Sequence, residues 1–339
     1  MHKPANVLRH KYGYSRLTGT LWDEEKNGLP FALHLDHKVT PEEFGKILAD
    51  HYEGFEDNTD FYGPGRSPHH SAEHRRICVA STIDAIVCEF SDEPMRTKLW
   101  TCPGRPCTLP YLPFHPAAGL PKVMINMPKP SQNTEEHYLP APERMLYYPN
   151  VPQLFRDYQN FADMLYCDVM EKASENLAKI NEMIRKNSAE AENKALEMAA
   201  AGDTKKALAY LCGEDNKSVL SALAQLQQHA DMYFNIYEAS AEAFMLNERT
   251  EEVCAEFTCG SMPKEESLVL GLGGQNIRSQ YARAKEGSLK VLGNGRYSAV
   301  FGVAPFDRDL HTKGYYDMTL GGNEADGKAF AARLMLECK

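Results

Sequence analysis

The sequence lacks long hydrophobic runs and clusters of basic residues, and these absences exclude two classes of protein. Nothing approaches the roughly 18 consecutive apolar residues that a membrane-spanning helix needs. Asp and Glu outnumber Lys and Arg by 47 to 37, which leaves a formal net charge of −10. Phosphate recognition needs clustered Lys and Arg, so a nucleic-acid-binding surface is not expected. We therefore expect neither a membrane nor a nucleic acid as partner.

A secretory signal and the cysteine spacing of a disulfide framework are also missing. The basic residues near the N-terminus are not followed by an apolar segment. The nine cysteines are an odd number, and several lie in apolar stretches, as Cys88 does in AIVCEF. Reduced, mostly buried thiols are the resulting interpretation, and they favour a cytoplasmic or otherwise reducing location.

The residues that are present divide the chain into three regions. The 339 residues have an ordinary globular composition, and this length suggests two or three structural units. Residues 1–150 are rich in Pro, Gly, His and aromatics, residues 151–247 have helical periodicity, and residues 248–339 hold short strand candidates between Gly-rich turns. The predicted fold class is α+β, with a helical hairpin or bundle and a small β-rich terminal unit.

Several elements have specific signals. Thr40, Pro41 and Glu43 form a capping box that predicts a helix from residue 41. Residues 76–90 and 96–104 are predicted to be neighbouring strands. A long helical stripe covers 151–186, two helices broken at Gly202 with Asp203 as the second cap cover 190–214, and a further helix covers 218–246. Four strands are predicted within 267–304 and 315–322, and a closing helix over 325–339.

Histidines supply the first candidate site. Ligand-type residues gather in two short segments, HLDH and SPHHSAEH: His34, Asp36, His37, His69, His70 and His74. No known metal spacing is matched, and Pro68 precedes the second group, so solvated loop histidines are the interpretation. No metal site is predicted, and a metalloenzyme that uses these histidines is the alternative.

Two further patterns favour turns over cofactor sites. Cys102 and Cys107 in CPGRPC are spaced more widely than the CxxC of redox and zinc sites, which favours a Pro-Gly turn flanked by packing thiols. GLGGQN lacks the full GxGxxG spacing and the acidic residue about 20 positions later that a dinucleotide site needs. No cofactor is therefore predicted.

Arg75, in HRRICVAST, enters a predicted buried strand. An isolated buried charge is costly, so this arginine must be paired or functional. In an amidohydrolase its guanidinium would hold a substrate carboxylate or steady the surroundings of the nucleophile. A structural ion pair with an Asp or Glu is the alternative.

Four stretches in order resemble the cysteine N-terminal-nucleophile dipeptidases, the dipeptidase A and secernin group. They are LHLDHKVTPEEFGKILADHYEG, HRRICVAS, LWTCPGRPCTLPYLPFHPAAGLP and VPQLFRDYQNFADMLYCDVMEK. The resemblance covers roughly residues 28–245. Arg75 matches an arginine of the family, whereas Arg76 departs from the usual residue. The resemblance implies part of an αββα hydrolase sandwich with a helical insertion, and hydrolysis of dipeptides.

The family's nucleophile has no counterpart here. In the family, autoprocessing exposes a cysteine at position one, whose thiolate attacks the amide carbon while its own α-amine serves as the base. This chain begins Met-His, and its first cysteine is Cys78, inside a strand candidate. We therefore expect the nucleophile to lie outside this chain, in an upstream segment or a partner subunit. The expected partners are that segment or subunit, or further copies of this chain in a homo-oligomer.

The predicted function is that of a dipeptidase-family amide hydrolase component that is inactive alone. Arg75 is the predicted catalytic residue, and His34 and His37, at the cleft rim, are the predicted substrate-binding residues for a dipeptide. The alternative is a non-catalytic binding or scaffold relative of the family.

Overall fold

The computed structural model describes residues 4–56, 68–70, 76–79, 82, 84–125, 151–246, 249–272, 281–302 and 314–338. Helices and strands are both abundant, which confirms the α+β class. The chain divides into two compact units. Unit 1 comprises residues 1–61, 68–121 and 179–219, and unit 2 comprises residues 62–67, 122–178 and 220–339.

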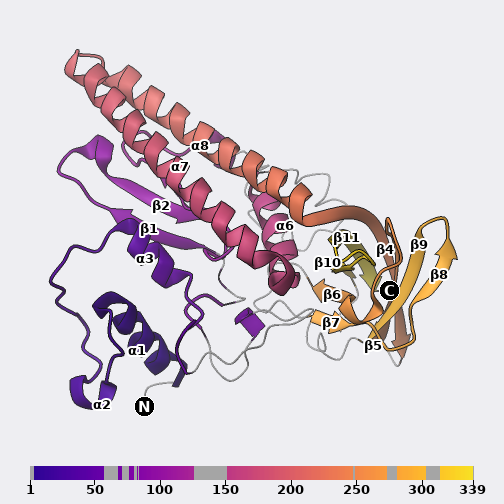
Figure 1. The fold of residues 1–339 in the computed structure, drawn as a ribbon. Helices are drawn as coiled ribbons and strands as arrows, with labels where there is room; N and C mark the ends of the chain where they lie inside the picture. Colours follow the sequence, from indigo (N-terminus) through magenta and orange to yellow (C-terminus); the bar gives the residue numbers. More distant parts are fainter. Residues whose placement is uncertain are drawn as a thin grey trace. The chain divides into compact units, whose positions relative to one another are not determined.

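Unit 1 contains a small antiparallel sheet and the N-terminal helices (Figure 1). Its helices are α1 (Pro4–Thr18), α2 (Glu24–Asn27) and α3 (Pro41–Leu48), with short 3-10 turns at Pro68–His70 and Pro94–Arg96. Its strands are β1 (Ala85–Glu89), β2 (Lys98–Cys102) and β3 (Leu112–Phe114). The sheet order is β1-β2-β3, so the prediction that the first two strands are neighbours is confirmed. Helix α3 packs beside β1.

The predicted capping box sets the start of α3. The Thr40 hydroxyl accepts a hydrogen bond from the Glu43 N–H at 3.2 Å, and the Thr40 N–H donates to a Glu43 carboxylate oxygen at 2.7 Å. These bonds satisfy helix N–H groups that would otherwise lack a partner. The helix ends at Leu48, so the residues just after it are held at a defined place beside the small sheet.

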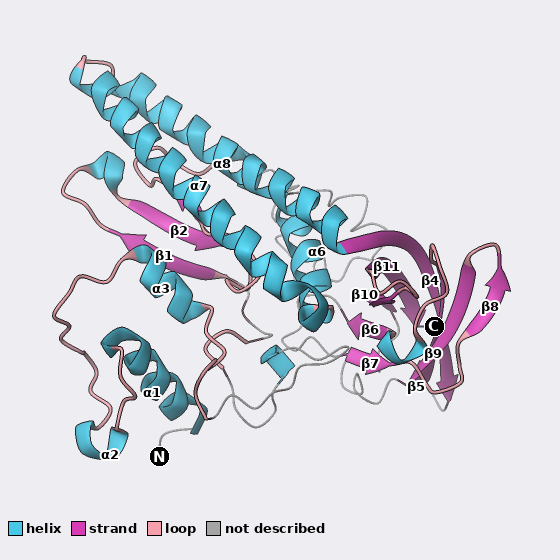
Figure 2. Ribbon diagram, viewed as in Figure 1, coloured by secondary structure: helices cyan, strands magenta, loops and turns pink. Residues whose placement is uncertain are grey.

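The helical region forms α6 (Val151–Met164), α7 (Tyr166–Ala200) and α8 (Thr204–Tyr233). The predicted break is confirmed: Gly202 has a φ of 94°, and the Asp203 carboxylate accepts from the Lys206 N–H at 3.3 Å. Figure 2 shows α7 and α8 as a helical hairpin. Small side chains pack between the two helices near the turn, among them Ala191, Ala195 and Ala207. Both helices contribute residues to both units.

Unit 2 contains a short helix, α4 (Lys122–Ile125), a 3-10 turn at Glu265–Ser267 and an eight-stranded sheet of order β7-β6-β10-β11-β4-β5-β9-β8. The strands are β4 (Phe234–Leu246), β5 (Arg249–Thr258), β6 (Val269–Leu272), β7 (Tyr281–Arg283), β8 (Lys290–Gly293), β9 (Arg296–Gly302), β10 (Gly314–Asn323) and β11 (Ala329–Cys338). Its core includes Phe257, Leu270, Phe301, Leu320 and Phe330, all at most 3% exposed. The four predicted strands of this region are confirmed as β6, β8, β9 and β10.

Three predicted elements are wrong. Residues 234–246, predicted as the end of a helix, form β4, and residues 329–338, predicted within a closing helix, form β11. In β11 the buried residues Phe330, Ala332, Leu334 and Leu336 alternate along one face, and pairing with β10 and β4 outweighs the helix propensity of the Ala and Leu residues. Residues 76–79 form a bend rather than part of a strand.

No helix in the described parts of the chain combines the length and apolar character needed to cross a membrane.

Candidate metal centre

Unit 1 brings together four metal-ligating side chains from four separate segments. His51 follows α3, His69 lies in the 3-10 turn, Cys78 lies in the 76–79 bend, and Cys107 lies in the turn after β2. One ligand atom from each residue lies within 4.8 Å of all the others. No two of these residues are closer than nine positions in the sequence, so only the fold makes them neighbours.

Backbone hydrogen bonds join two of these segments. The Asp50 carboxylate accepts from the Tyr52 N–H at 2.5 Å, which turns the chain just after α3. Tyr52 has a φ of 71°, the left-handed region that a non-glycine residue adopts only when its surroundings hold it there. The Asp50 carbonyl accepts from the Cys78 N–H at 3.1 Å. These bonds place His51 and Cys78 beside each other.

Cys107 is held by a tight turn that follows β2. The Arg105 carbonyl accepts hydrogen bonds from the N–H groups of Thr108 and Leu109, each at 3.0 Å. Cys102, the other cysteine of this segment, remains in β2, and its thiol donates to the Leu109 and Gly104 carbonyls, each at 3.5 Å. The predicted Pro-Gly turn is therefore confirmed, but its two thiols point to different surroundings.

The spacing of the ligand atoms matches a tetrahedral site. His51 Nε2 lies 3.0 Å from His69 Nε2, which lies 3.2 Å from Cys107 Sγ and 3.7 Å from Cys78 Sγ, and the two sulfurs are 3.6 Å apart. Zinc bonds of about 2.0–2.1 Å to nitrogen and about 2.3 Å to sulfur imply tetrahedral edges of roughly 3.3 Å for N–N, 3.6 Å for N–S and 3.8 Å for S–S. These four separations are close to the edges of a tetrahedron around one ion, and the distances from His51 Nε2 to the two sulfurs are at most 4.8 Å.

A carboxylate outside the cluster orients one of the ligands. The Nδ1 of His51 lies 2.8 Å from a Glu53 carboxylate oxygen, and the His51 N–H donates to the other oxygen at 2.9 Å. A proton on Nδ1 that Glu53 accepts leaves Nε2, the atom that faces the cluster, as the nitrogen that binds an ion once the metal displaces its proton. Metal-binding histidines are commonly oriented in this way.

The side chains polarise one another. Burial by itself raises the pKa of the Cys78 thiol, but hydrogen bonds with Cys107, His51 and His69 outweigh it and hold this pKa well below its ordinary value. Burial lowers the pKa of His51, yet its bonds to Cys78 and Glu53 raise it to about 9. Burial raises the pKa of Glu53, and the bond with His51 lowers it to about 2. A thiolate, the form that binds metal, is thus favoured before any ion arrives.

The burial of its side chains distinguishes this centre from the site of a catalytic nucleophile. A cysteine beside a histidine that is oriented by a carboxylate also suits covalent catalysis. The Cys78 side chain is fully buried, however, and His51 and His69 are 1% and 6% exposed. A substrate carbonyl has no access to a thiol in that position. The arrangement therefore suits a closed metal site better than an attacking nucleophile.

Neither predicted substrate-binding residue, His34 or His37, belongs to this cluster. Arg75 and His74, and the side chain of His70, lie outside the described residues. His34 and His37 are exposed, and His37 contacts Glu43 at 3.8 Å.

His69 is the member of the predicted histidine groups that the structure places in the cluster, and its interpretation as a solvated loop histidine is wrong because it is buried. Sequence reasoning missed His51, Cys78 and Cys107 as ligands. The four residues are separated by 18, 9 and 29 positions in the sequence, so no short spacing linked them.

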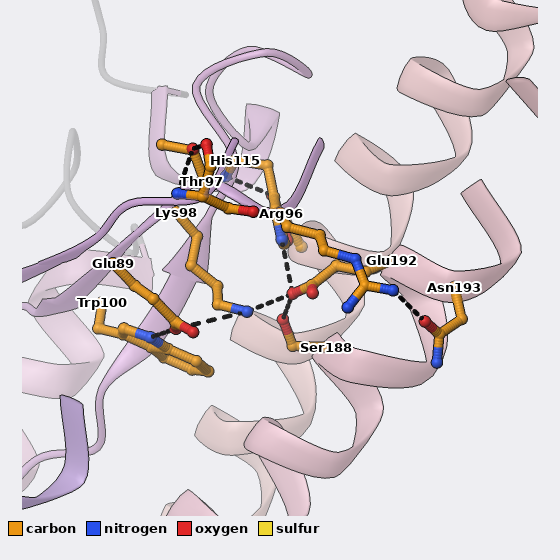
Figure 3. Close-up of polar contacts among 11 residues, drawn as sticks. Glu89, Arg96, Thr97, Lys98, Trp100, His115, Ser188, Glu192 and Asn193 are labelled. Carbon is orange, nitrogen blue, oxygen red and sulfur yellow. Dashed lines mark hydrogen bonds and ion pairs between the residues drawn. The ribbon is translucent and has the colours of Figure 1, made fainter. Parts of the chain in front are cut away.

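A second buried polar cluster joins the small sheet to the helical hairpin within unit 1. Glu192 of α7 accepts hydrogen bonds from Lys98 of β2 and from Ser188 at 3.1 Å (Figure 3). His115, just after β3, lies 3.2 Å from Glu192 through Nε2 and 2.8 Å from Asp215 of α8 through Nδ1. Lys98, His115, Glu192 and Asp215 are at most 6% exposed. Lys98 also contacts the partly exposed carboxylate of Glu89 at 3.5 Å. We call the four buried residues the clasp, because their polar contacts join the sheet to both helices.

A scan of protein-family models finds none that matches the chain, and a search of curated proteins finds no match either.

Proposed function

We propose that this protein binds one zinc ion through His51, His69, Cys78 and Cys107, and that the ion stabilises unit 1. The observation that carries the proposal is the convergence of two imidazole nitrogens and two sulfurs, from four segments, within 4.8 Å of one another.

The donor set favours zinc over other ions. Two thiolates and two imidazoles suit a borderline-soft ion with tetrahedral geometry, whereas Mg²⁺ and Ca²⁺ prefer oxygen ligands. Two thiolates also neutralise the charge of a divalent ion in a buried position. Four protein ligands leave no open coordination position, so the role is structural rather than catalytic.

Metal analysis of the purified chain tests this proposal. We expect about one zinc ion per chain, and cobalt substitution should give the absorption of a tetrahedral thiolate site. Cys107→Ser should lose most of the bound metal. Cys88→Ser is the matched control, because Cys88 is an exposed thiol on β1 outside the cluster. A wild-type chain without metal after reconstitution, or metal retained equally by both variants, would contradict the proposal.

The resemblance to the dipeptidase A and secernin group supports a second, independent proposal. We propose that the chain is a component of an amide hydrolase of that group, with the cysteine nucleophile supplied from outside this chain and a dipeptide as substrate. Part of an αββα sandwich and a partner that carries the nucleophile, an upstream segment or subunit, belong to the same proposal. Three proposed zinc ligands, His51, Cys78 and Cys107, lie in the resembling segments.

Co-expression with the product of the adjacent upstream reading frame tests the hydrolase proposal. Dipeptide hydrolysis is expected from the combined products and not from this chain alone. If the combination is inactive and the isolated chain is stable and monodisperse, the alternative of a non-catalytic binding or scaffold protein gains support. Zinc content is measured separately, so the two proposals fail independently.

A further inference from the structure

The two cysteines of the metal centre differ in exposure and lie next to each other. Cys78 Sγ and Cys107 Sγ are 3.6 Å apart, whereas a disulfide needs about 2.05 Å, so the sulfurs must approach by only a small movement. Cys78 is fully buried, and Cys107 is partly exposed. A small oxidant therefore reaches Cys107 first, and the sulfur of Cys78 lies next to it.

Both cysteines lie in backbone that can adjust without breaking a sheet. Cys78 is in the bend at 76–79, and Cys107 is in the turn that follows β2. The third thiol of this neighbourhood, Cys102, is held within β2 by hydrogen bonds to carbonyls. Burial, and next the charge of Cys78, raise the pKa of Cys102 well above its ordinary value, so it stays a poorly reactive thiol.

We propose that Cys78 and Cys107 are an oxidation site at which a peroxide converts the two zinc-bound thiolates to a disulfide and expels the zinc ion. This inference rests on the zinc proposal above. Two imidazoles alone are a poor zinc site, so loss of both sulfur ligands releases the metal.

The reaction proceeds in two steps. The Cys107 thiolate attacks the O–O bond of the peroxide, forms the sulfenic acid and, with one proton taken up, releases the alcohol or water. The Cys78 thiolate then attacks the Cys107 sulfur, forms the S–S bond and expels hydroxide, which a second proton converts to water. The two sulfurs together lose two electrons, and the O–O bond gains them. A dithiol reductant reverses the change, after which zinc rebinds.

Treatment of the zinc-loaded full chain with hydrogen peroxide tests the proposal. A metallochromic dye should report about one zinc ion released per disulfide formed, and peptide mass spectrometry should find Cys78 joined to Cys107. A dithiol with added zinc should restore the original metal content. Cys88→Ser should behave like the wild type, because Cys88 is an exposed thiol outside the centre.

Cys107→His supplies the sharper comparison, because it keeps four donor side chains but leaves one sulfur. Where this variant binds zinc, it should retain the ion under peroxide concentrations that empty the wild type. If the variant does not fold or does not bind zinc, the proposal is tested by the Cys78–Cys107 crosslink and the zinc release of the wild type.

The failures are distinguishable. If the reconstituted chain holds no zinc before peroxide is added, both the zinc proposal and the oxidation proposal are contradicted. Zinc that stays bound during oxidation, or that leaves without the crosslink between Cys78 and Cys107, contradicts the oxidation site alone.

Discussion

At the residue scale, the metal centre depends on side chains that do not themselves touch the ion. The Glu53 carboxylate orients His51 through Nδ1, and the Asp50 carboxylate shapes the turn that carries it. Arg16 forms an ion pair with Asp50, and its guanidinium also lies 4.4 Å above the Phe55 ring. The residues after α3 are thus held from several sides, and this preorganises one of the four ligands.

Glu53→Gln should weaken zinc binding roughly 10–100-fold, because the neutral amide accepts the His51 proton less strongly and its amide group can turn the wrong way. Competition with a chelator of known affinity measures the effect. Glu56→Gln is the control, since Glu56 is 78% exposed and forms an ion pair with Lys11 rather than with a residue of the cluster. Equal affinities for the two variants would show that Glu53 does not orient the ligand.

At the element scale, the buried clasp connects three elements that the sequence does not place together. His115 follows β3, Glu192 lies on α7 and Asp215 lies on α8, so one imidazole lies between the small sheet and both helices of the hairpin. The His115 N–H adds a backbone hydrogen bond to Asp215 at 3.1 Å. Loss of the charge on this imidazole would remove the cation that the buried carboxylates of Asp215 and Glu192 share.

The clasp should make stability depend on pH. Burial lowers the pKa of His115, but hydrogen bonds and charge from Asp215 and then Glu192 raise it above the ordinary 6.5. A folded-state pKa above the unfolded value means that the contribution is complete below about pH 6.5 and is lost as pH rises through the folded pKa. Urea unfolding of the zinc-loaded protein, measured from about pH 6.5 upward, should show that the free energy of unfolding falls as the pH rises. This fall should be smaller in His115→Asn than in the wild type.

His34→Asn is the matched control for this comparison, because His34 is exposed. Its unfolding free energy should follow the wild type at every pH. Parallel curves for wild type and His115→Asn would contradict the clasp as the source of the pH dependence.

At the scale of the whole molecule, the metal centre and the large sheet belong to different units. All four proposed ligands lie in unit 1, whereas the eight-stranded sheet and its apolar core lie in unit 2. The proposed ion joins four segments of unit 1 that lie mostly in turns and bends. Unit 2 has a separate hydrophobic core. Metal loss should therefore act locally.

Removal of zinc by a chelator should increase hydrogen exchange in residues 49–56, 76–79 and 103–110, because the ion no longer joins these segments. Peptides from β5 and β9 should keep their protection, since they lie in the core of unit 2. Mass spectrometry of peptides digested from the exchanged full chain, with and without chelation, measures both. A uniform increase over the two units, or no change near the ligands, would be the contrary result.

The sequence by itself determined the local elements. The capping box of α3, the break at Gly202 and the strands β1, β2, β6, β8, β9 and β10 follow from side-chain chemistry within a few residues, and the structure has them. Only tertiary pairing decided β4 and β11, where Ala-rich segments with helical propensity are recruited into a sheet. The metal centre was hidden for a related reason. The ligand residues that contact each other are 9 to 38 positions apart in the sequence. Only the turns of the folded chain bring their ligand atoms within 4.8 Å of one another.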